Sequence, residues 1–275
     1  MLLIFINAGA DIIETNTYHL CIKKLRECRG YSVEQAESLV KVFINAGADI
    51  IETNTYHLCI KKLRECRGYS VEQAESLVKL AVQIARDAIS SSGRSVQLVG
   101  SVGPYATYLR DGSEYTGDYV KKPDFNEQVW DEKLPKVLFF FQIIIDYYLS
   151  QCRPLIAAGI RTLVFETIPT LKEVECVGKV LDQLGPEVRA WIVSTCQDGK
   201  RTRSGDLFSS VVKVANSIQK VVAVGVNCTA PENITELLEE ANKTGNRKAL
   251  VIYPNSGEIW NPVLQQFQGA TQIEM

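Results

Sequence analysis

The chain has 275 residues, of which 46% are hydrophobic and 23% are charged, with 30 basic and 32 acidic side chains. The formal net charge of -2 argues against a nucleic-acid partner, because phosphate binding needs a concentrated basic surface. The longest apolar segment, residues 138–145, is far shorter than the roughly 20 residues of a membrane span. The N-terminus lacks the basic start and cleavage site of a signal peptide. We therefore expect a soluble, cytoplasmic protein without a membrane partner.

Residues 4–41 recur as residues 42–79 with one difference, Ile4 against Val42. Solenoid repeats diverge at the surface and need about three units to bury a core. Two near-identical copies indicate a recent duplication or an error in the gene model instead. Of the eight cysteines, Cys21 and Cys28 in the first copy of the repeat correspond to Cys59 and Cys66 in the second. The chain contains no CxxC motif or Cys/His cluster. We expect reduced thiols and a single domain over residues 1–275.

Short apolar segments of β-forming residues alternate with longer segments of helical periodicity. The strands predicted in this way are Asp49–Glu52, Val96–Gly100, Thr162–Glu166, Ala190–Ser194, Val221–Val226 and Ala249–Tyr253. Each is almost wholly apolar, as expected for strands covered on both faces. The helices predicted between them are Val71–Ser90, Leu171–Leu184 and Pro231–Thr244.

Two α/β architectures accommodate these units, an open doubly wound sheet and a (β/α)8 TIM barrel. Polar or small residues follow five of the predicted strands, at residues 52–56, 100–105, 166–167, 227–229 and 253–256. A barrel builds its site from many strand ends, whereas an open sheet uses one crevice. No dinucleotide or P-loop motif follows the first strand. We therefore expect an incomplete TIM barrel, with its first and last strands missing or replaced.

Five motifs at these strand ends occur together in one known family. In chain order they are GADIIETNTY (residues 47–56), GSVGPYA (100–106), FETIP (165–169), GVNCTAP (225–231) and YPNSGE (253–258). In this combination the chain resembles the homocysteine S-methyltransferase family, which includes betaine-homocysteine and S-methylmethionine-homocysteine methyltransferases. The resemblance runs from about Phe43 to Trp260.

The resemblance implies transfer of a methyl group from S-methylmethionine or S-adenosylmethionine to L-homocysteine, giving methionine. In such enzymes Zn2+ deprotonates the substrate thiol, whose usual pKa is ~8.5, at an open tetrahedral position. Cys228 matches the first zinc ligand, and Glu166 matches the carboxylate that holds the substrate ammonium. Asn227 is placed to support the site beside Cys228, and Tyr56 resembles the aromatic residue near the methyl donor.

The chain departs from the family pattern at both ends. The family's last strand carries a Gly-Gly-Cys-Cys block with the other two zinc ligands, and residues 269–275 lie about where that block should begin. The first copy of the repeat occupies the place of the family's Asp-Gly-Gly strand. A second hypothesis is therefore a catalytically inactive, truncated barrel that binds an amino acid weakly. The segment Leu138–Tyr148 is more apolar than its family counterpart, and we interpret it as a divergent or mistranslated insertion.

Missing first and last strands would leave two parallel sheet edges open. We predict self-association through these edges unless residues 10–15 dock as a substitute strand. Alternation along Asp49–Glu52 sends one of its two acidic residues inward and leaves open which one. For Tyr105, ordinary packing and a ligand contact are both open.

Overall fold

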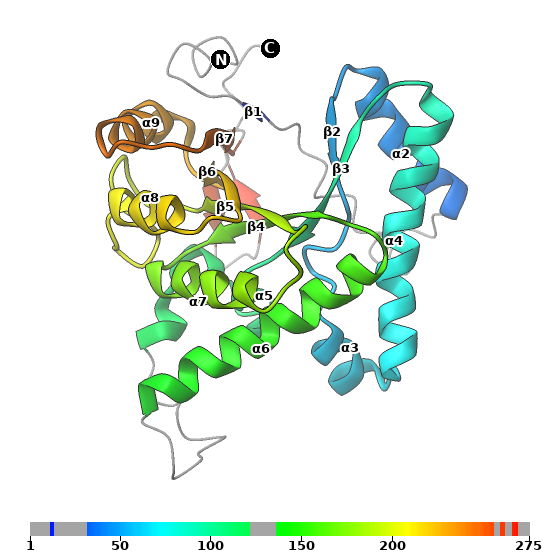
Figure 1. Cartoon of the computed structure of the whole chain (residues 1–275), viewed down its shortest axis with the longest axis horizontal. Helices are drawn as coiled ribbons and strands as arrows, with labels where there is room; N and C mark the ends of the chain where they lie inside the picture. The colour runs from blue at the N-terminus through cyan, green and yellow to red at the C-terminus, as the bar shows by residue number, and fades with distance from the viewer. Residues whose placement is uncertain (1–11, 14–31, 122–135, 256–258, 262–265, 269–275) are drawn as a thin grey trace.

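A curled sheet of seven strands forms the centre of the molecule in the computed structural model, which describes residues 12–13, 32–121, 136–255, 259–261 and 266–268 (Figure 1). The strand order is β1-β7-β6-β5-β4-β3-β2, and every neighbouring pair is parallel. The strands are β1 (Ile12–Ile13), β2 (Ile50–Glu52), β3 (Gln97–Val102), β4 (Thr162–Ile168), β5 (Arg189–Ser194), β6 (Val221–Asn227) and β7 (Ala249–Tyr253). The six predicted strands are confirmed, and the curled parallel sheet agrees with an incomplete TIM barrel.

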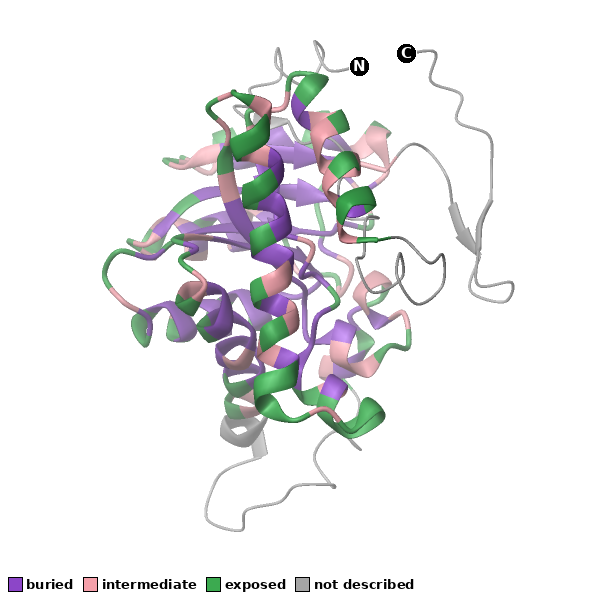
Figure 2. Cartoon of the chain, turned by 90° about the vertical axis from the view of Figure 1, so that its right-hand side faces the viewer, coloured by how far each residue is buried: buried purple, intermediate pink, exposed green. Residues whose placement is uncertain are grey.

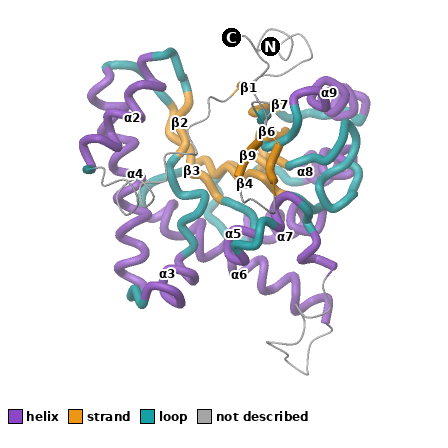
Figure 3. Tube along the Cα trace, turned by 180° about the vertical axis from the view of Figure 1, so that it is seen from behind, coloured by secondary structure: helices purple, strands orange, loops and turns teal. Residues whose placement is uncertain are grey.

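Helices cover the outer, convex face of this sheet (Figures 1 and 3). The described helices are α2 (Val33–Asn45), α3 (Ile60–Arg67), α4 (Val71–Ser92), α5 (Ala106–Leu109), α6 (Lys136–Ala157), α7 (Leu171–Asp182), α8 (Phe208–Ser217) and α9 (Ile234–Lys243). Short 3-10 turns occur at η2 (Ser113–Tyr115), η3 (Asp118–Lys121) and η5 (Pro231–Asn233), and β8 (Ile259–Asn261) pairs with β9 (Gln266–Gln268) in antiparallel fashion. The three predicted helices are confirmed, although Pro231–Asn233 forms a 3-10 turn before α9. No helix in the described part of the chain could cross a membrane.

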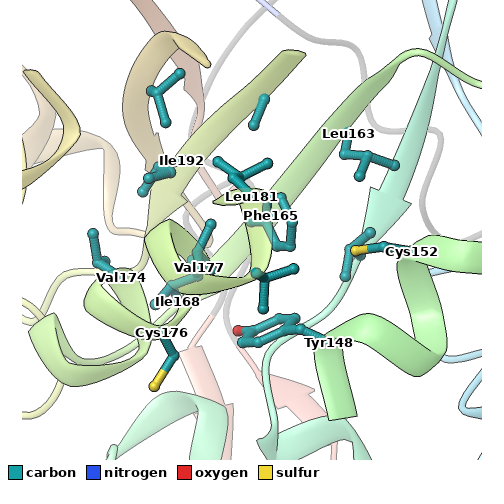
Figure 4. Close-up of a cluster of buried hydrophobic side chains, with 14 of the residues drawn as sticks. Tyr148, Cys152, Leu163, Phe165, Ile168, Val174, Cys176, Val177, Leu181 and Ile192 are labelled. Atoms are coloured by element: carbon teal, nitrogen blue, oxygen red, sulfur yellow. The ribbon is translucent and has the colours of Figure 1, made fainter. Parts of the chain in front are cut away.

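The segment interpreted above as an insertion is part of α6, which joins β3 to β4. Ile144, Tyr148 and Cys152 are spaced four residues apart on α6 and are fully buried. Figure 4 shows Tyr148 and Cys152 facing side chains of β4 and α7, including Phe165. The interpretation as an insertion is therefore wrong, because the apolar residues form the core-facing side of a crossover helix.

The two copies of the repeat form matching elements in different places. Ile12–Ile13 of the first copy and Ile50–Ile51 of the second are the same residues, and they lie at opposite edges of the described sheet. Ile12–Ile13 pairs with Val251–Ile252 of β7. Docking of the first copy is therefore confirmed for these two residues, whereas the rest of residues 10–15 lies outside the described part of the chain.

The repeat also begins two helices in the same way. Ser32 precedes α2 and Ser70 precedes α4, and each side chain accepts a hydrogen bond from the backbone N–H of a glutamine three residues later. The side chains of Gln35 and Gln73 accept from the two serine N–H groups in return, at 2.7 and 2.8 Å. Both helix starts are thus fixed by their own first turn.

The sheet buries both of its faces (Figure 2). The outer face packs against the helices, and the inner face carries a second apolar cluster of Val99, Val164, Trp191, Val193, Ala223, Val251 and Tyr253. Because side chains alternate along a strand, the residues two positions beyond Val99 and Val164 also point inward. Those residues are Ser101 and Glu166, so the inner face changes from apolar to polar near the carboxyl ends of the strands.

Candidate functional site

A layer of polar side chains lines the inner face of the sheet at the carboxyl ends of successive strands. Each side chain is buried, and each strand from β2 to β7 contributes one within two residues of its end. They are Glu52, Ser101, Glu166, Thr195, Asn227 and Tyr253. Polar groups gathered in this way at strand ends are typical of a TIM-barrel site. Of the two acidic residues in the first predicted strand, Glu52 points inward, while the Asp49 side chain is 84% exposed beside Arg94.

Glu166 lies at the centre of this layer and is 1% exposed. Its carboxylate accepts hydrogen bonds from the Ser101 hydroxyl, from the Tyr253 hydroxyl at 3.1 Å and from Asn227 Nδ2 at 3.5 Å. The carboxyl group of Glu52, which is also buried, influences the pKa of Glu166. Burial is the largest influence and raises the pKa of Glu166, while these hydrogen bonds oppose the rise. Two buried carboxyl groups in contact favour a shared proton, and an incoming cation would replace that proton.

Cys228 lies directly beyond β6, and its sulfur faces Thr167. The side chain of Asn227 connects the two residues, because its Oδ1 accepts from the Thr167 N–H at 3.0 Å. Its Nδ2 donates to Thr167 Oγ1 at 2.8 Å and lies 3.6 Å from Cys228 Sγ. Thr167 and Cys228 have left-handed backbones, with φ of 59° and 44°. Such strain costs about 1–3 kcal/mol per residue and is concentrated at functional sites.

Tyr56 follows β2, and its hydroxyl lies within electrostatic reach of the Cys228 thiol. It is 8% exposed, and burial raises the pKa of its hydroxyl, followed by the influence of Cys228. Gly103 permits this placement, because a Cβ there would lie 2.6 Å from the Tyr56 carbonyl oxygen. Tyr105, by contrast, packs against the rings of Tyr119 and Tyr147 with centroids 6.1 and 5.3 Å away. Tyr105 is therefore part of the aromatic core.

A second buried carboxyl group, Glu173, lies at the start of α7. It accepts hydrogen bonds from the hydroxyl groups of Tyr119 and Tyr148 and from the Tyr105 N–H. Burial raises the pKa of Glu173 to about 7, and the hydrogen bonds limit the rise. Because Tyr119 belongs to η3, Glu173 ties the loop between β3 and α6 to the core.

The described residues do not form a zinc site. No group of three His, Cys, Asp or Glu side chains that could hold a metal occurs among them. Cys196 is buried, and its backbone N–H donates to Thr229 Oγ1 at 2.9 Å. Cys59 caps α3 and Cys66 is exposed on that helix, and all six described cysteines are free thiols. Cys228 alone falls short of the three protein ligands of a catalytic zinc.

The structure thus brings together the four residues singled out from the sequence, Tyr56, Glu166, Asn227 and Cys228. Ser101 and Tyr253 belong to the motifs at the strand ends, but the sequence analysis assigns them no separate role. Thr167 is likewise part of a motif, but nothing in the sequence predicts its left-handed backbone. Arg203, which donates to the Cys228 carbonyl oxygen at 3.3 Å, lies in a loop without periodicity or motif.

Comparison with known proteins identifies the family. The family model described as homocysteine S-methyltransferase matches residues 32–273. The chain belongs to the homocysteine S-methyltransferase family. Homocysteine S-methyltransferase 1 of Arabidopsis thaliana is 34% identical over 264 residues, covering 96% of this chain and 67% of that protein. Selenocysteine Se-methyltransferase of Brassica oleracea var. italica is 32% identical over 269 residues, covering 98% and 66%.

Solved structures of the family share the fold. The metallated form of the homocysteine methyltransferase MmuM from Escherichia coli has a TM-score of 0.73 at 24% identity, covering 93% of this chain and 87% of that one. Its oxidized form has a TM-score of 0.72 at 27% identity, covering 94% and 80%. The chain spans between 44% and 67% of the length of the curated relatives.

Proposed function

We propose that this family member transfers a methyl group to the sulfur of L-homocysteine, giving methionine. The observation that carries the proposal is the continuous contact from the buried Glu166 carboxylate through Asn227 to the Cys228 thiol. An amino acid with a thiol side chain presents an ammonium and a sulfur, which match the two ends of this arrangement. The donor would be S-methylmethionine or S-adenosylmethionine.

Glu166 would bind the ammonium of homocysteine. Ser101, Tyr253 and Asn227 all donate to its carboxylate and hold it in one orientation. The buried carboxylate would gain a cationic partner, which offsets the cost of its desolvation. Binding would therefore hold the ammonium end of homocysteine at the inner face of β4.

The acceptor sulfur would then lie beside Cys228 and Tyr56. In the transfer, the homocysteine thiol loses its proton to solvent water, and its sulfur forms a bond to the methyl carbon. The bond between that carbon and the donor sulfonium breaks, so the donor leaves as a neutral thioether. The ring of Tyr56 would face the donor cation, since aromatic faces attract sulfonium and ammonium groups.

Isotope transfer tests this proposal directly. The chain would be incubated with homocysteine and S-methylmethionine labelled in its methyl groups, and labelled methionine would be measured by mass spectrometry. Glu166→Gln should lower kcat/KM about 10- to 100-fold through a weaker charge-assisted contact. Glu175→Gln on the exposed face of α7 is the matched control. Lack of labelled methionine with either proposed donor would contradict the proposal.

A second candidate function is amino-acid binding without methyl transfer. It is favoured by the lack of a three-ligand metal group in the described part of the chain. Elemental analysis after purification under reducing conditions separates the candidates, because an active zinc enzyme should retain about one zinc per chain, lost in Cys228→Ala. Homocysteine binding without zinc or labelled product would favour the second candidate.

We also propose a cytoplasmic location and a role in methionine synthesis, which follow from the family and the acceptor chemistry. The whole chain would act as a single domain.

A further inference from the structure

Arg203 is a half-buried cation next to Cys228. Its Nε donates to Thr195 Oγ1 at 3.3 Å and its Nη2 donates to the Cys228 carbonyl oxygen at 3.3 Å. A guanidinium carries five N–H donors, so three stay uncommitted within the described part of the chain. No carboxylate among the described residues forms an ion pair with Arg203. The uncommitted donors suit an anion with two oxygens.

Glu114 in η2 is a half-buried acidic residue that lacks a cationic partner among the described residues. Its Oε2 atom is buried and makes no hydrogen bond to the described residues. Burial raises the pKa of Glu114, which expresses the cost of holding its charge without a partner. Glu114 directly precedes Tyr115 in η2, and after burial and Cys228 its charge adds to the raised pKa of the Tyr56 and Tyr115 hydroxyl groups. A carboxylate beside aromatic rings suits a cation.

These two charges belong to loops that touch each other. Gly117, just after η2, packs so closely on Ser204 that an added Cβ would lie 2.8 Å from the Ser204 Cβ. Its φ of 68° is left-handed, so the glycine serves both the turn and the contact. Ser204 directly follows Arg203, whose Nη2 donates to the Cys228 carbonyl oxygen. The contact of Gly117 with Ser204 thus brings the loop of Glu114 and Tyr115 beside the loop of Arg203, next to Cys228.

We propose that Glu114 and Arg203 form the binding site for the methyl donor, a sulfonium amino acid. Arg203 would take its α-carboxylate, and Glu114 with the rings of Tyr56 and Tyr115 would take its methyl-bearing cation. This assignment rests on the proposed methyl transfer. It gives donor and acceptor separate charged partners, because Glu166 serves the acceptor ammonium.

Calorimetric binding of S-methylmethionine, without acceptor, tests the two roles. Glu114→Gln and Arg203→Gln should each weaken S-methylmethionine binding about tenfold or more and leave homocysteine binding within about twofold. Methionine, which lacks the sulfonium charge, separates the residues further. Glu114→Gln should leave methionine binding unchanged, whereas Arg203→Gln should weaken it as well.

Matched controls guard against a folding effect. Arg201→Gln removes an exposed arginine of the same loop, which pairs with Asp198, and should leave S-methylmethionine binding unchanged. Thermal unfolding of each variant reports whether it folds, and Arg203→Lys should restore part of the binding because it restores the charge. Equal weakening of methionine and S-methylmethionine by Glu114→Gln would overturn the role of Glu114.

The outcomes also separate this inference from the proposed function. A wild-type chain that binds S-methylmethionine through Glu114 and Arg203 but forms no labelled methionine would contradict the methyl transfer and leave the binding site standing. A wild-type chain that transfers methyl groups, with variants that lose homocysteine binding instead, would overturn the donor site alone.

Discussion

The hydroxyl of Thr167 lies 3.8 Å from the sulfur of Cys228, and both residues hold a left-handed backbone. They belong to β4 and to the end of β6, which are separated in the sheet by β5. The side chain of Asn227 hydrogen-bonds to Thr167 and reaches the Cys228 sulfur. The strained backbones of Thr167 and Cys228 therefore hold the Cys228 thiol in place at the centre of the sheet.

Replacing Thr167 by glycine tests this strain. Thr167→Gly should lower the free energy of unfolding by at most about 1 kcal/mol, because relief of about 1–3 kcal/mol of strain offsets the lost hydrogen bonds. Thr195→Gly is the matched control, since Thr195 is also buried and donates to Cys228 but has no left-handed backbone. Thr195→Gly should lower the free energy of unfolding by about 2 kcal/mol more than Thr167→Gly does, because it relieves no backbone strain. Equal losses in urea denaturation would contradict the prediction.

Homocysteine binding should release a proton from the Glu52–Glu166 pair. Burial raises the pKa of Glu166, and an ammonium partner lowers it again, so the proton held at lower pH leaves on binding. Calorimetry in buffers of different ionisation enthalpy measures this release. The release should be largest between the lowered pKa of the bound form and the raised pKa of the free form, and it should vanish well above the raised pKa. Glu52→Gln should reduce it. A binding enthalpy that is independent of the buffer from about pH 5 to about pH 8 would count against it.

Glu173 predicts a loss of stability as the pH rises. Its folded pKa of about 7 exceeds the ordinary value of 4.5, so the folded chain binds more protons than the unfolded chain between these values. The free energy of unfolding should therefore fall by about 3 kcal/mol from pH 4.5 to 7 through this group. In Glu173→Gln the Tm should decline less over this range, whereas the exposed Glu175→Gln should follow the wild type. Parallel declines in all three proteins would refute the assignment.

The β1 strand should limit self-association through the β7 edge. Ile12→Pro with Ile13→Pro removes the two N–H donors of β1, and the freed edge of Val251–Ile252 would be open to other molecules. We expect a larger sedimentation coefficient at high protein concentration for this double variant. Leu2→Pro with Leu3→Pro, outside β1, is the control. Identical sedimentation of both variants would speak against edge protection.

The strands and the meeting of Glu166, Asn227 and Cys228 could be predicted from the sequence because their signals are local. Apolar segments such as Thr162–Ile168 alternate with helical periodicity, and Glu166, Asn227 and Cys228 lie at strand ends that must meet at one end of a parallel sheet. The helix α6 was misinterpreted, since its apolar side near Ile144 and Tyr148 is wider than that of an ordinary surface helix. The apolar composition of α6 obscured its place as the crossover helix between β3 and β4.

The partners in the loops could not be predicted in the same way. Glu114 and Arg203 lie 89 residues apart in segments without periodicity, and the contact of Gly117 with Ser204 brings their loops together. Glu173 lies in the first turn of the predicted helix Leu171–Leu184, where an acidic side chain is favourable without any buried partner. Its carboxyl is buried because Tyr119 and Tyr148 arrive from two other segments.

The duplicated helix start gives the molecule a built-in reference for amide exchange. Residues 32–41 and 70–79 have the same sequence and the same cap, yet α2 has 13 residues and α4 has 22. Amides with identical neighbours share one intrinsic exchange rate, so any difference in protection between the two segments reports their surroundings alone. One labelling experiment on the intact chain would therefore separate the helix-forming tendency of these ten residues from the contribution of tertiary packing.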